Sequence, residues 1–142
     1  MSRTGPIIVV DDDKDDHDII ADALRSLKIS NKVKFFERAD DVLHYLRTTT
    51  DNPFIIICDI NLPFMNGLEM RREINNDEFL RRKSIPFIFL TTSPDQRAIA
   101  EAYDLMVQGF FIKRDTFDEI KESMRMIIGY WLNCLHPNSG PR

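Results

Sequence analysis

Five short hydrophobic segments recur along the chain, and polar, helix-like segments separate them. The hydrophobic segments are residues 6–10, 33–36, 54–58, 86–90 and 109–112. Each is too short to form a stable helix, and together they are rich in β-branched and aromatic residues, which is typical of strands. In most of them the hydrophobic residues are continuous and do not alternate with polar ones. This pattern favours strands that are buried on both faces of a sheet.

The segments between these strands carry hydrophobic residues at helical spacing. Helices are predicted over residues 15–28 and 39–48, from Gly67 onwards, from Ser93 onwards and from Phe117 to Leu135. Ser93 is expected to be an N-cap, followed by Pro94 at the first helical position and Gln96 as the partner in a capping box. Asp115 is expected to cap the last helix. The alternation of strands and helices predicts an α/β domain with a parallel sheet and helices on both of its faces.

The length and composition fit one globular domain. The chain has 142 residues, of which 43% are hydrophobic and 30% charged, so it can bury a core. The domain is predicted to span residues 1–135, and residues 136–142 are predicted to be a disordered tail. A net charge of −4 argues against a nucleic-acid-binding surface. Cys58 and Cys134 form no disulfide framework, which is typical of a reducing cytoplasm, and no segment approaches membrane-spanning length.

Acidic, hydroxyl and basic side chains stand at the ends of four of the predicted strands. Asp11 and Asp12 follow the first strand, Asp59 follows the third, and Thr91 and Lys113 follow the fourth and the fifth. The carboxyl ends of parallel strands lie at one edge of a sheet, so these side chains are expected to converge there. Carboxylates gathered without a cation would repel each other and raise each other's pKa. The cluster therefore predicts a hard divalent cation, with Lys113 as a second positive charge.

This arrangement resembles the receiver domain of the response regulators of two-component signalling systems, in particular stand-alone regulators of the chemotaxis type. The resemblance rests on the strand-end residues above and on Asn61, Pro63 and Gly67 after Asp59, and it covers about residues 6–132. It implies a flavodoxin-like, doubly wound fold with five parallel strands in the order 2-1-3-4-5 and helices on both faces. The combination is specific, because five separate positions must agree in type and in order.

The resemblance implies a role for each of these residues. Asp59 would be the phosphoacceptor, Thr91 would bond the phosphoryl group, and Lys113 would pair with it. The ligands of Mg²⁺ would be Asp11, Asp12, Asp59 and the backbone carbonyl of Asn61; Phe110 would be the aromatic residue that switches with Thr91; and Asn61 and Ser93 are candidates for tuning dephosphorylation. Arg114 replaces the proline that usually follows the family's lysine, so a cis or a trans Lys113–Arg114 bond is left open.

The favoured function is a stand-alone, phosphorylation-dependent switch and not an enzyme that turns over a separate substrate. The resemblance implies that the protein accepts a phosphoryl group from a histidine kinase or a phosphotransfer protein and slowly hydrolyses it. No output domain is expected in the chain, so the signal is expected to pass through changed contacts with a downstream protein. A receiver-like domain that binds its partner without phosphorylation is disfavoured, because the site is complete.

A magnesium-dependent phosphohydrolase of the haloacid-dehalogenase type is the alternative. Such enzymes also combine an aspartate nucleophile after a first strand with a strand-end threonine, a lysine and Mg²⁺, and residues 11–13 offer their D-x-D pattern. Their motif continues with a small or β-branched pair, however, whereas Lys14 and Asp15 follow here. This alternative also leaves Asp59 without a role.

Two further groups of residues are interpreted from the pattern. The acidic residues Asp13, Asp15, Asp16 and Asp18 are expected to form a solvated helix start, favoured by the helix dipole. The last predicted helix is longer than the sheet requires, so Tyr130, Leu132 and Leu135 are expected to extend beyond the domain's edge. Exposed hydrophobic residues tend to mark interaction sites, so the last strand and helix are candidates for a homodimer or target contact. The alternative is that this overhang folds back over its own domain.

Overall fold

The computed structural model describes residues 2–92 and 95–138 and contains a five-stranded sheet. Its strands are β1 (Ile7–Val10), β2 (Val33–Phe36), β3 (Ile55–Cys58), β4 (Phe87–Thr91) and β5 (Gly109–Ile112). All neighbouring strands pair in parallel, in the order β2-β1-β3-β4-β5. The predicted fold class and strand order are therefore confirmed.

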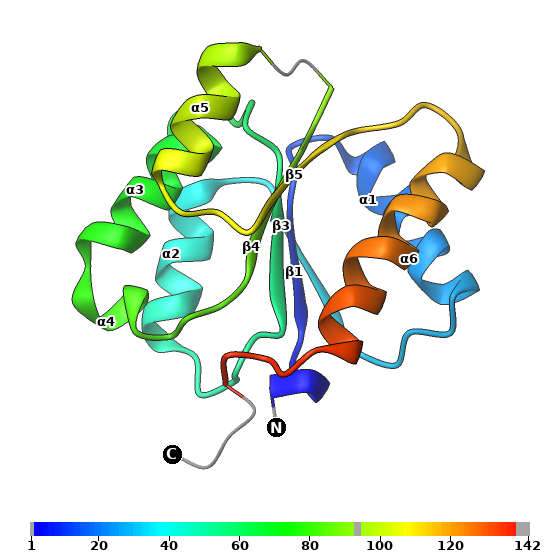
Figure 1. Cartoon of the computed structure of the whole chain (residues 1–142), viewed down its shortest axis with the longest axis horizontal. Helices are drawn as coiled ribbons and strands as arrows, with labels where there is room; N and C mark the ends of the chain where they lie inside the picture. The colour runs from blue at the N-terminus through cyan, green and yellow to red at the C-terminus, as the bar shows by residue number, and fades with distance from the viewer. Residues whose placement is uncertain (1, 93–94, 139–142) are drawn as a thin grey trace.

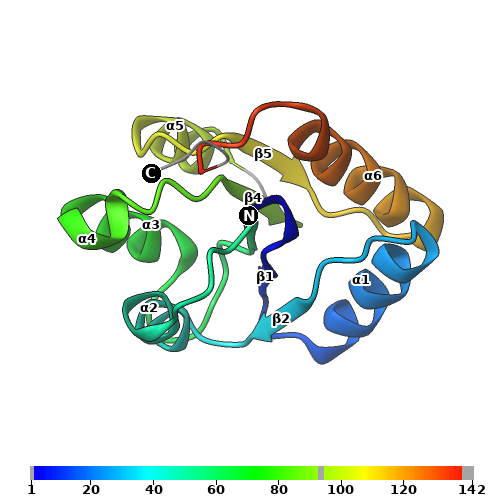
Figure 2. The same cartoon turned by 90° about the horizontal axis from the view of Figure 1, so that it is seen from below.

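Helices cover both faces of this sheet (Figure 1). They are η1 (Ser2–Thr4), α1 (Lys14–Ser26), α2 (Ala39–Thr48), α3 (Gly67–Asn76), α4 (Glu78–Arg81), α5 (Gln96–Asp104) and α6 (Phe117–Asn133). Figure 2 shows α1 and α6 on one face of the sheet and α2, α3 and α5 on the other. The short η1 and α4 were not predicted. Within the described residues, no helix is long and hydrophobic enough to cross a membrane.

The hydrophobic core has two halves, one on each face of the sheet. Val10 and Phe89 belong to the half beneath α2, α3 and α5, whereas Val9 and Ile88 belong to the half beneath α1 and α6. Successive residues alternate between the halves because side chains alternate between the two faces along a strand. Burial of both faces explains why the strands read as continuous hydrophobic segments in the sequence.

The start of α5 differs from the sequence prediction. The helix begins at Gln96, and its N-cap is Asp95, whose side chain accepts a hydrogen bond from the Ala98 N–H at 2.7 Å. Ser93 is therefore not the N-cap, and Ser93 and Pro94 lie outside the described residues. The prediction was wrong because serine and aspartate can both cap a helix, and the sequence alone does not show whether Ser93 or Asp95 precedes the first helical turn.

The last helix, α6, begins at Phe117 as predicted, but its N-cap and its end were predicted wrongly. Its N-cap is Thr116 and not Asp115, because the Thr116 hydroxyl oxygen accepts a hydrogen bond from the Glu119 N–H at 3.2 Å. The helix ends at Asn133, where the chain becomes extended at Cys134, and so it does not reach Leu135.

The chain after α6 crosses beneath the sheet and packs against it. His136 is buried, and its Nε2 donates a hydrogen bond to the Phe54 carbonyl oxygen at 2.7 Å, while its ring stacks on the Phe54 ring. Asn138 Nδ2 donates to the Lys83 carbonyl oxygen at 2.6 Å. The prediction of a disordered tail is therefore wrong for residues 136–138, and residues 139–142 lie outside the described part of the chain.

Candidate functional site

Four of the strand-end residues predicted from the sequence meet at the carboxyl edge of the sheet, whereas Asp12 is exposed. Asp11 follows β1 and Asp59 follows the adjacent β3, and the Asp59 N–H donates a hydrogen bond to the Val10 carbonyl oxygen at 2.9 Å. Thr91 ends β4, and its carbonyl oxygen accepts a hydrogen bond from the Lys113 N–H at 2.7 Å after β5. The parallel register thus holds residues that are far apart in sequence at one edge.

The Lys113 ammonium group is the centre of this cluster. Its Nζ donates hydrogen bonds to Asp11 Oδ2 at 2.6 Å, to Asp59 Oδ2 at 2.9 Å and to Asp16 Oδ2 at 2.9 Å. The Lys113 side chain is only 8% exposed, so these contacts are largely shielded from water. One buried cation therefore joins three carboxylates from β1, α1 and β3.

Asp16 is a site residue that the sequence analysis missed. It was expected to lie in solvent with the other acidic residues of the helix start, yet it bonds Lys113. A signal for this position exists in the sequence, because Asp16 precedes the buried Ile20 and Ala23 by four and seven residues on α1. This spacing places Asp16 on the inward face of the helix.

Burial and hydrogen bonding within the cluster shift the pKa of two groups. Burial raises the pKa of Asp11 to about 6, although its hydrogen bond to Lys113 acts in the opposite direction. For Lys113, burial acts to lower the pKa, but the hydrogen bonds to Asp11, Asp16 and Asp59 outweigh burial and hold the pKa above its ordinary value. Burial thus disfavours the charged form of the Asp11 carboxyl group, while the surrounding carboxylates favour the charged form of the Lys113 ammonium group.

Thr91 lies beside this cluster with an unused hydroxyl group. The residue is fully buried at the end of β4, and within the described residues Thr91 Oγ1 has no hydrogen-bond partner. Buried hydroxyl groups are nearly always hydrogen-bonded, so an unpartnered one in a site needs an explanation. A ligand oxygen that reaches the site from solvent would satisfy it.

The loop after Asp59 approaches the site closely at Gly67. A Cβ atom at Gly67 would lie 2.6 Å from the Asp59 carbonyl oxygen and 2.9 Å from a ring carbon of Phe89. In the same loop, the Asn61 N–H donates a hydrogen bond to Asp59 Oδ1 at 3.2 Å. Asn66 and Glu69 form a capping box that starts α3 directly behind the loop. This packing fixes one Asp59 oxygen and leaves the other to Lys113.

Phe110, the predicted switch residue, lies on β5 next to the site. It pairs in register with Phe89 of β4, and the two ring centroids are 5.9 Å apart. Side chains alternate along a strand, so Phe89 and Thr91 lie on the same face of β4. Phe110 is half-buried and packs against the core half that contains Phe89. The described residues contain no cis peptide bond, so the Lys113–Arg114 bond is trans.

The predicted ligands of a metal ion are only partly brought together in this structure. Within residues 2–92 and 95–138, no three acidic, histidine or cysteine side chains are grouped to hold a metal ion. Asp11 and Asp59 are bonded to Lys113, and Asp12 is exposed. The donor set nevertheless suits Mg²⁺, which takes one or two carboxylates and keeps several water ligands. The excess negative charge around Lys113 also favours a second cation.

The fold and this site define a class of signalling domain, namely a receiver with an aspartate at the centre of its sheet. The family model of the response regulator receiver domain matches residues 7–125. The chain therefore belongs to this family, which acts in two-component signalling, and the haloacid-dehalogenase alternative is not favoured.

Several relatives share this fold over nearly their full length. The chemotaxis protein CheY of Pseudomonas aeruginosa is 30% identical over 122 residues, which cover 85% of this chain and 94% of that protein. Response regulator Rcp1 of Synechocystis is 25% identical over 134 residues, 91% of this chain and 90% of that protein. The structure of the phosphorylated cyanobacterial phytochrome response regulator RcpA matches with a TM-score of 0.85 at 28% identity, covering 94% of this chain and 99% of that one.

Proposed function

We propose that this protein is a switch that accepts a phosphoryl group on Asp59 from a histidine kinase or a phosphotransfer protein. The observation that carries this proposal is that Asp59 Oδ2 is bonded to Lys113, while the buried Thr91 hydroxyl group beside them has no partner within the described residues. A nucleophile, a cation and a free donor thus lie around one position, which is what phosphoryl transfer requires.

The transfer follows from these positions. An Asp59 carboxylate oxygen attacks the phosphorus atom, the bond between phosphorus and the donor's nitrogen or oxygen breaks, and its electron pair leaves with the donor. Lys113 moves from the carboxylate to an oxygen of the phosphoryl group, and the Thr91 hydroxyl group donates to another. Hydrolysis by water later regenerates Asp59. No separate substrate is turned over, so the protein acts as a switch rather than as an enzyme.

We propose Asp11, Asp12, Asp59 and the Asn61 carbonyl oxygen as the residues that would hold Mg²⁺. When bound, the ion supplies positive charge to the phosphoryl oxygens. Support comes from the oxygen-rich donor set and from Rcp1, whose Mn²⁺-bound structure matches this fold with a TM-score of 0.81 at 24% identity. Asp11 is bonded to Lys113 in this structure, so cation binding is expected to compete with that contact.

The site of modification separates the proposed switch from a phosphohydrolase. The protein is treated with acetyl phosphate and Mg²⁺, the acyl phosphate is trapped by borohydride reduction, and the modified peptide is mapped. We expect the modification at Asp59. Modification at Asp11 instead would support the haloacid-dehalogenase mechanism and contradict the proposed function.

Asp12→Ala is expected to weaken Mg²⁺ binding by at least about tenfold, which is what loss of even a supporting residue costs at metal sites. Asp13→Ala is the matched control: the Asp13 side chain accepts a hydrogen bond from the Asp15 N–H at 2.8 Å as the N-cap of α1. Its loss should cost about 1 kcal/mol of stability and little affinity. Isothermal titration calorimetry measures the Mg²⁺ affinity of both variants. Equal losses of affinity would show that Asp12 is not a ligand.

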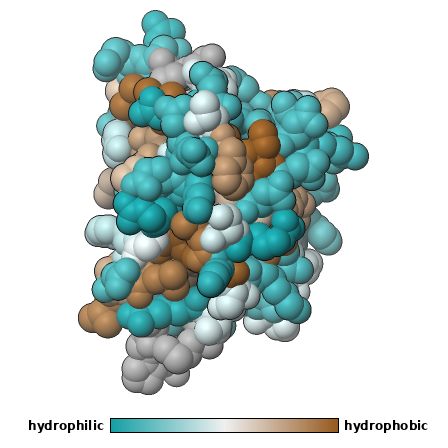
Figure 3. Space-filling model, turned by 90° about the vertical axis from the view of Figure 1, so that its right-hand side faces the viewer, coloured by the Kyte–Doolittle hydropathy of each residue, from teal (hydrophilic) through white to brown (hydrophobic). Residues whose placement is uncertain are grey.

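We propose further that phosphorylation controls a homodimer through β5 and α6. β5 is an edge strand, and Tyr130 of α6 lines a groove together with Phe111 of β5. Tyr130 and Leu135 are 64% and 85% exposed. Figure 3 shows hydrophobic areas between hydrophilic ones on the face that α1 and α6 form. Leu132, however, is half-buried against the core, so the predicted overhang is covered at this residue.

The double variant Tyr130→Asp, Leu135→Asp is expected to stay monomeric under conditions in which the wild type dimerises. Sedimentation velocity is measured for both proteins, with and without beryllofluoride and Mg²⁺. Phe79→Asp is the control, because Phe79 is 58% exposed on α4, on the other side of the sheet. A wild type that remains monomeric in every condition would exclude the dimer.

A further inference from the structure

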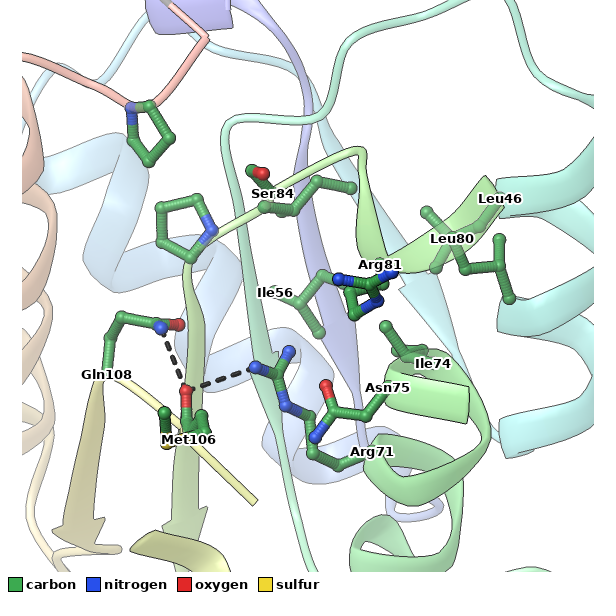
Figure 4. A pocket seen from close by; sticks show the side chains of 13 residues that line it. Leu46, Ile56, Arg71, Ile74, Asn75, Leu80, Arg81, Ser84, Met106 and Gln108 are labelled. Carbon is green, nitrogen blue, oxygen red and sulfur yellow. Dashed lines mark hydrogen bonds between the residues drawn. The ribbon is translucent and has the colours of Figure 1, made fainter. Parts of the chain in front are cut away.

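A cavity opens at the amino edge of the sheet, away from Asp59. Its volume is about 370 Å³, which is within the range of small-ligand pockets. Ile56 near the start of β3, Pro86 before β4 and Gln108 before β5 line it (Figure 4). The other half of its wall comes from α3 and α4, chiefly from the hydrophobic Ile74 and Leu80.

Arg71 of α3 is a buried cation in this wall without an anionic partner. Its Nε donates to the Leu105 carbonyl oxygen at 3.0 Å, and its Nη2 donates to the Met106 carbonyl oxygen at 3.1 Å. Its guanidinium carbon also lies 5.2 Å from the centre of the Phe87 ring. Arg71 is only 9% exposed, and within the described residues it makes no salt bridge. Burial lowers its pKa to about 10, which reflects the cost of a cation without a counter-charge.

Arg81 of α4 is a second cation on the same cavity. It is exposed, and no carboxylate in the described residues pairs with it. Its neighbours differ in this respect: Arg82 pairs with Glu78 at 3.6 Å, and Arg47 pairs with Asp77 at 3.4 Å. The acidic residues of this region are thus used by other arginines.

The lining of the cavity therefore carries two arginines and no acidic residue, in a chain with a net charge of −4. Figure 4 shows the Arg71 and Arg81 side chains in the same wall, with the Asn75 side chain next to Arg71. Asn75 Nδ2 donates to the Leu105 carbonyl oxygen at 2.8 Å, which holds this side chain in place. An anion at this position would add a full negative charge where Arg71 meets only carbonyl oxygens.

We propose that this cavity binds a small organic anion. A carboxylate or phosphate group pairs with Arg71 and Arg81, since guanidinium groups match the geometry of such anions. A short hydrophobic body lies against Ile56, Ile74 and Leu80. Pro86 and Gln108 lie directly before β4 and β5, the strands that end in Thr91 and precede Lys113. The ligand therefore contacts the opposite ends of two strands that build the phosphorylation site.

The test uses benzoate as the anionic probe and benzamide as its neutral counterpart, in the absence of Mg²⁺. Both are titrated into ¹⁵N-labelled protein, and the side-chain amide signals of Asn75 and Gln108 are followed by NMR. We expect saturable shifts of these signals with benzoate at millimolar concentration and none with benzamide. Equal binding of both probes, or shifts confined to the Asp59 loop, would overturn the proposal.

Two exposed arginines on adjacent positions provide a matched pair of variants. Arg81→Ala is expected to weaken benzoate binding about fivefold, which corresponds to the loss of one ion pair, whereas Arg82→Ala should leave it unchanged. Arg71→Lys keeps the charge but loses the forked geometry, and it should also weaken binding. Since Arg71 supports Leu105 and Met106, this variant is used only if its thermal unfolding matches the wild type. Equal affinities of the Arg81→Ala and Arg82→Ala proteins would contradict the assignment.

Discussion

Replacement of Asp59 with asparagine is expected to abolish Mg²⁺-dependent labelling by acetyl phosphate. The amide keeps the size of the side chain and an oxygen that can accept the Asn61 N–H, so the fold should survive. An amide is not a nucleophile towards phosphorus, however, and it removes one of the carboxylates around Lys113. Loss of labelling with an unchanged circular dichroism spectrum is the expected result.

The control for this experiment is Asp118→Asn. Asp118 is exposed in the first turn of α6, away from the cluster around Lys113, and its replacement should leave labelling at the wild-type level. Mass spectrometry of the intact protein measures the added phosphoryl group in each variant. Undiminished labelling of the Asp59→Asn protein would place the phosphoacceptor elsewhere and remove the basis of the proposed function.

Gly67→Ala is expected to destabilise the protein by about 1 to 3 kcal/mol, because overpacking against rigid neighbours is costly. The added methyl group would lie 2.6 Å from the Asp59 carbonyl oxygen, which is backbone and cannot turn away. The loop must shift to relieve this contact, so labelling of Asp59 should slow as well. Urea unfolding of the wild type and the variant gives the change in the free energy of unfolding.

Gly129→Ala is the matched control, since it adds the same methyl group in open space. Apart from its chain neighbours and the nearby backbone of α6 itself, no atom lies within 4 Å of a Cβ at Gly129. Alanine is favoured over glycine in a helix, so this variant should be more stable by about 0.5 to 1 kcal/mol. Similar effects of the two substitutions would show that the contact at Gly67 is not the cause.

The sheet and four of the site residues were predictable because their signals are local. Each strand is a hydrophobic segment bounded by polar residues, and the parallel direction of the strands follows from their alternation with helices. The order of the strands in the sheet was implied by the family resemblance. Asp11, Asp59, Thr91 and Lys113 each stand directly after or at the end of a strand, so the position of the strand places the side chain. For these residues, the sequence pattern is therefore sufficient to predict where the side chains lie in the sheet.

Other features depend on contacts between distant segments, and the pattern does not contain them. Asp16 was assigned to solvent because a run of acidic residues is usually solvated, and its bond to Lys113 exists only once α1 packs beside β1. His136 was assigned to a disordered tail because its neighbours are polar, yet Phe54, far away in sequence, supplies a carbonyl oxygen and a ring to stack on.

The N-caps of α5 and α6 also could not be predicted from the sequence, although the residues involved are neighbours along the chain. Several residues before each helix can cap it, and the choice of Asp95 and Thr116 is made by the approach of the chain to the first free N–H groups. The cavity at Arg71 is the clearest case. The sequence shows arginines in a polar segment, whereas burial of one of them without a counter-charge arises only when α3, α4 and three strand starts enclose the same space.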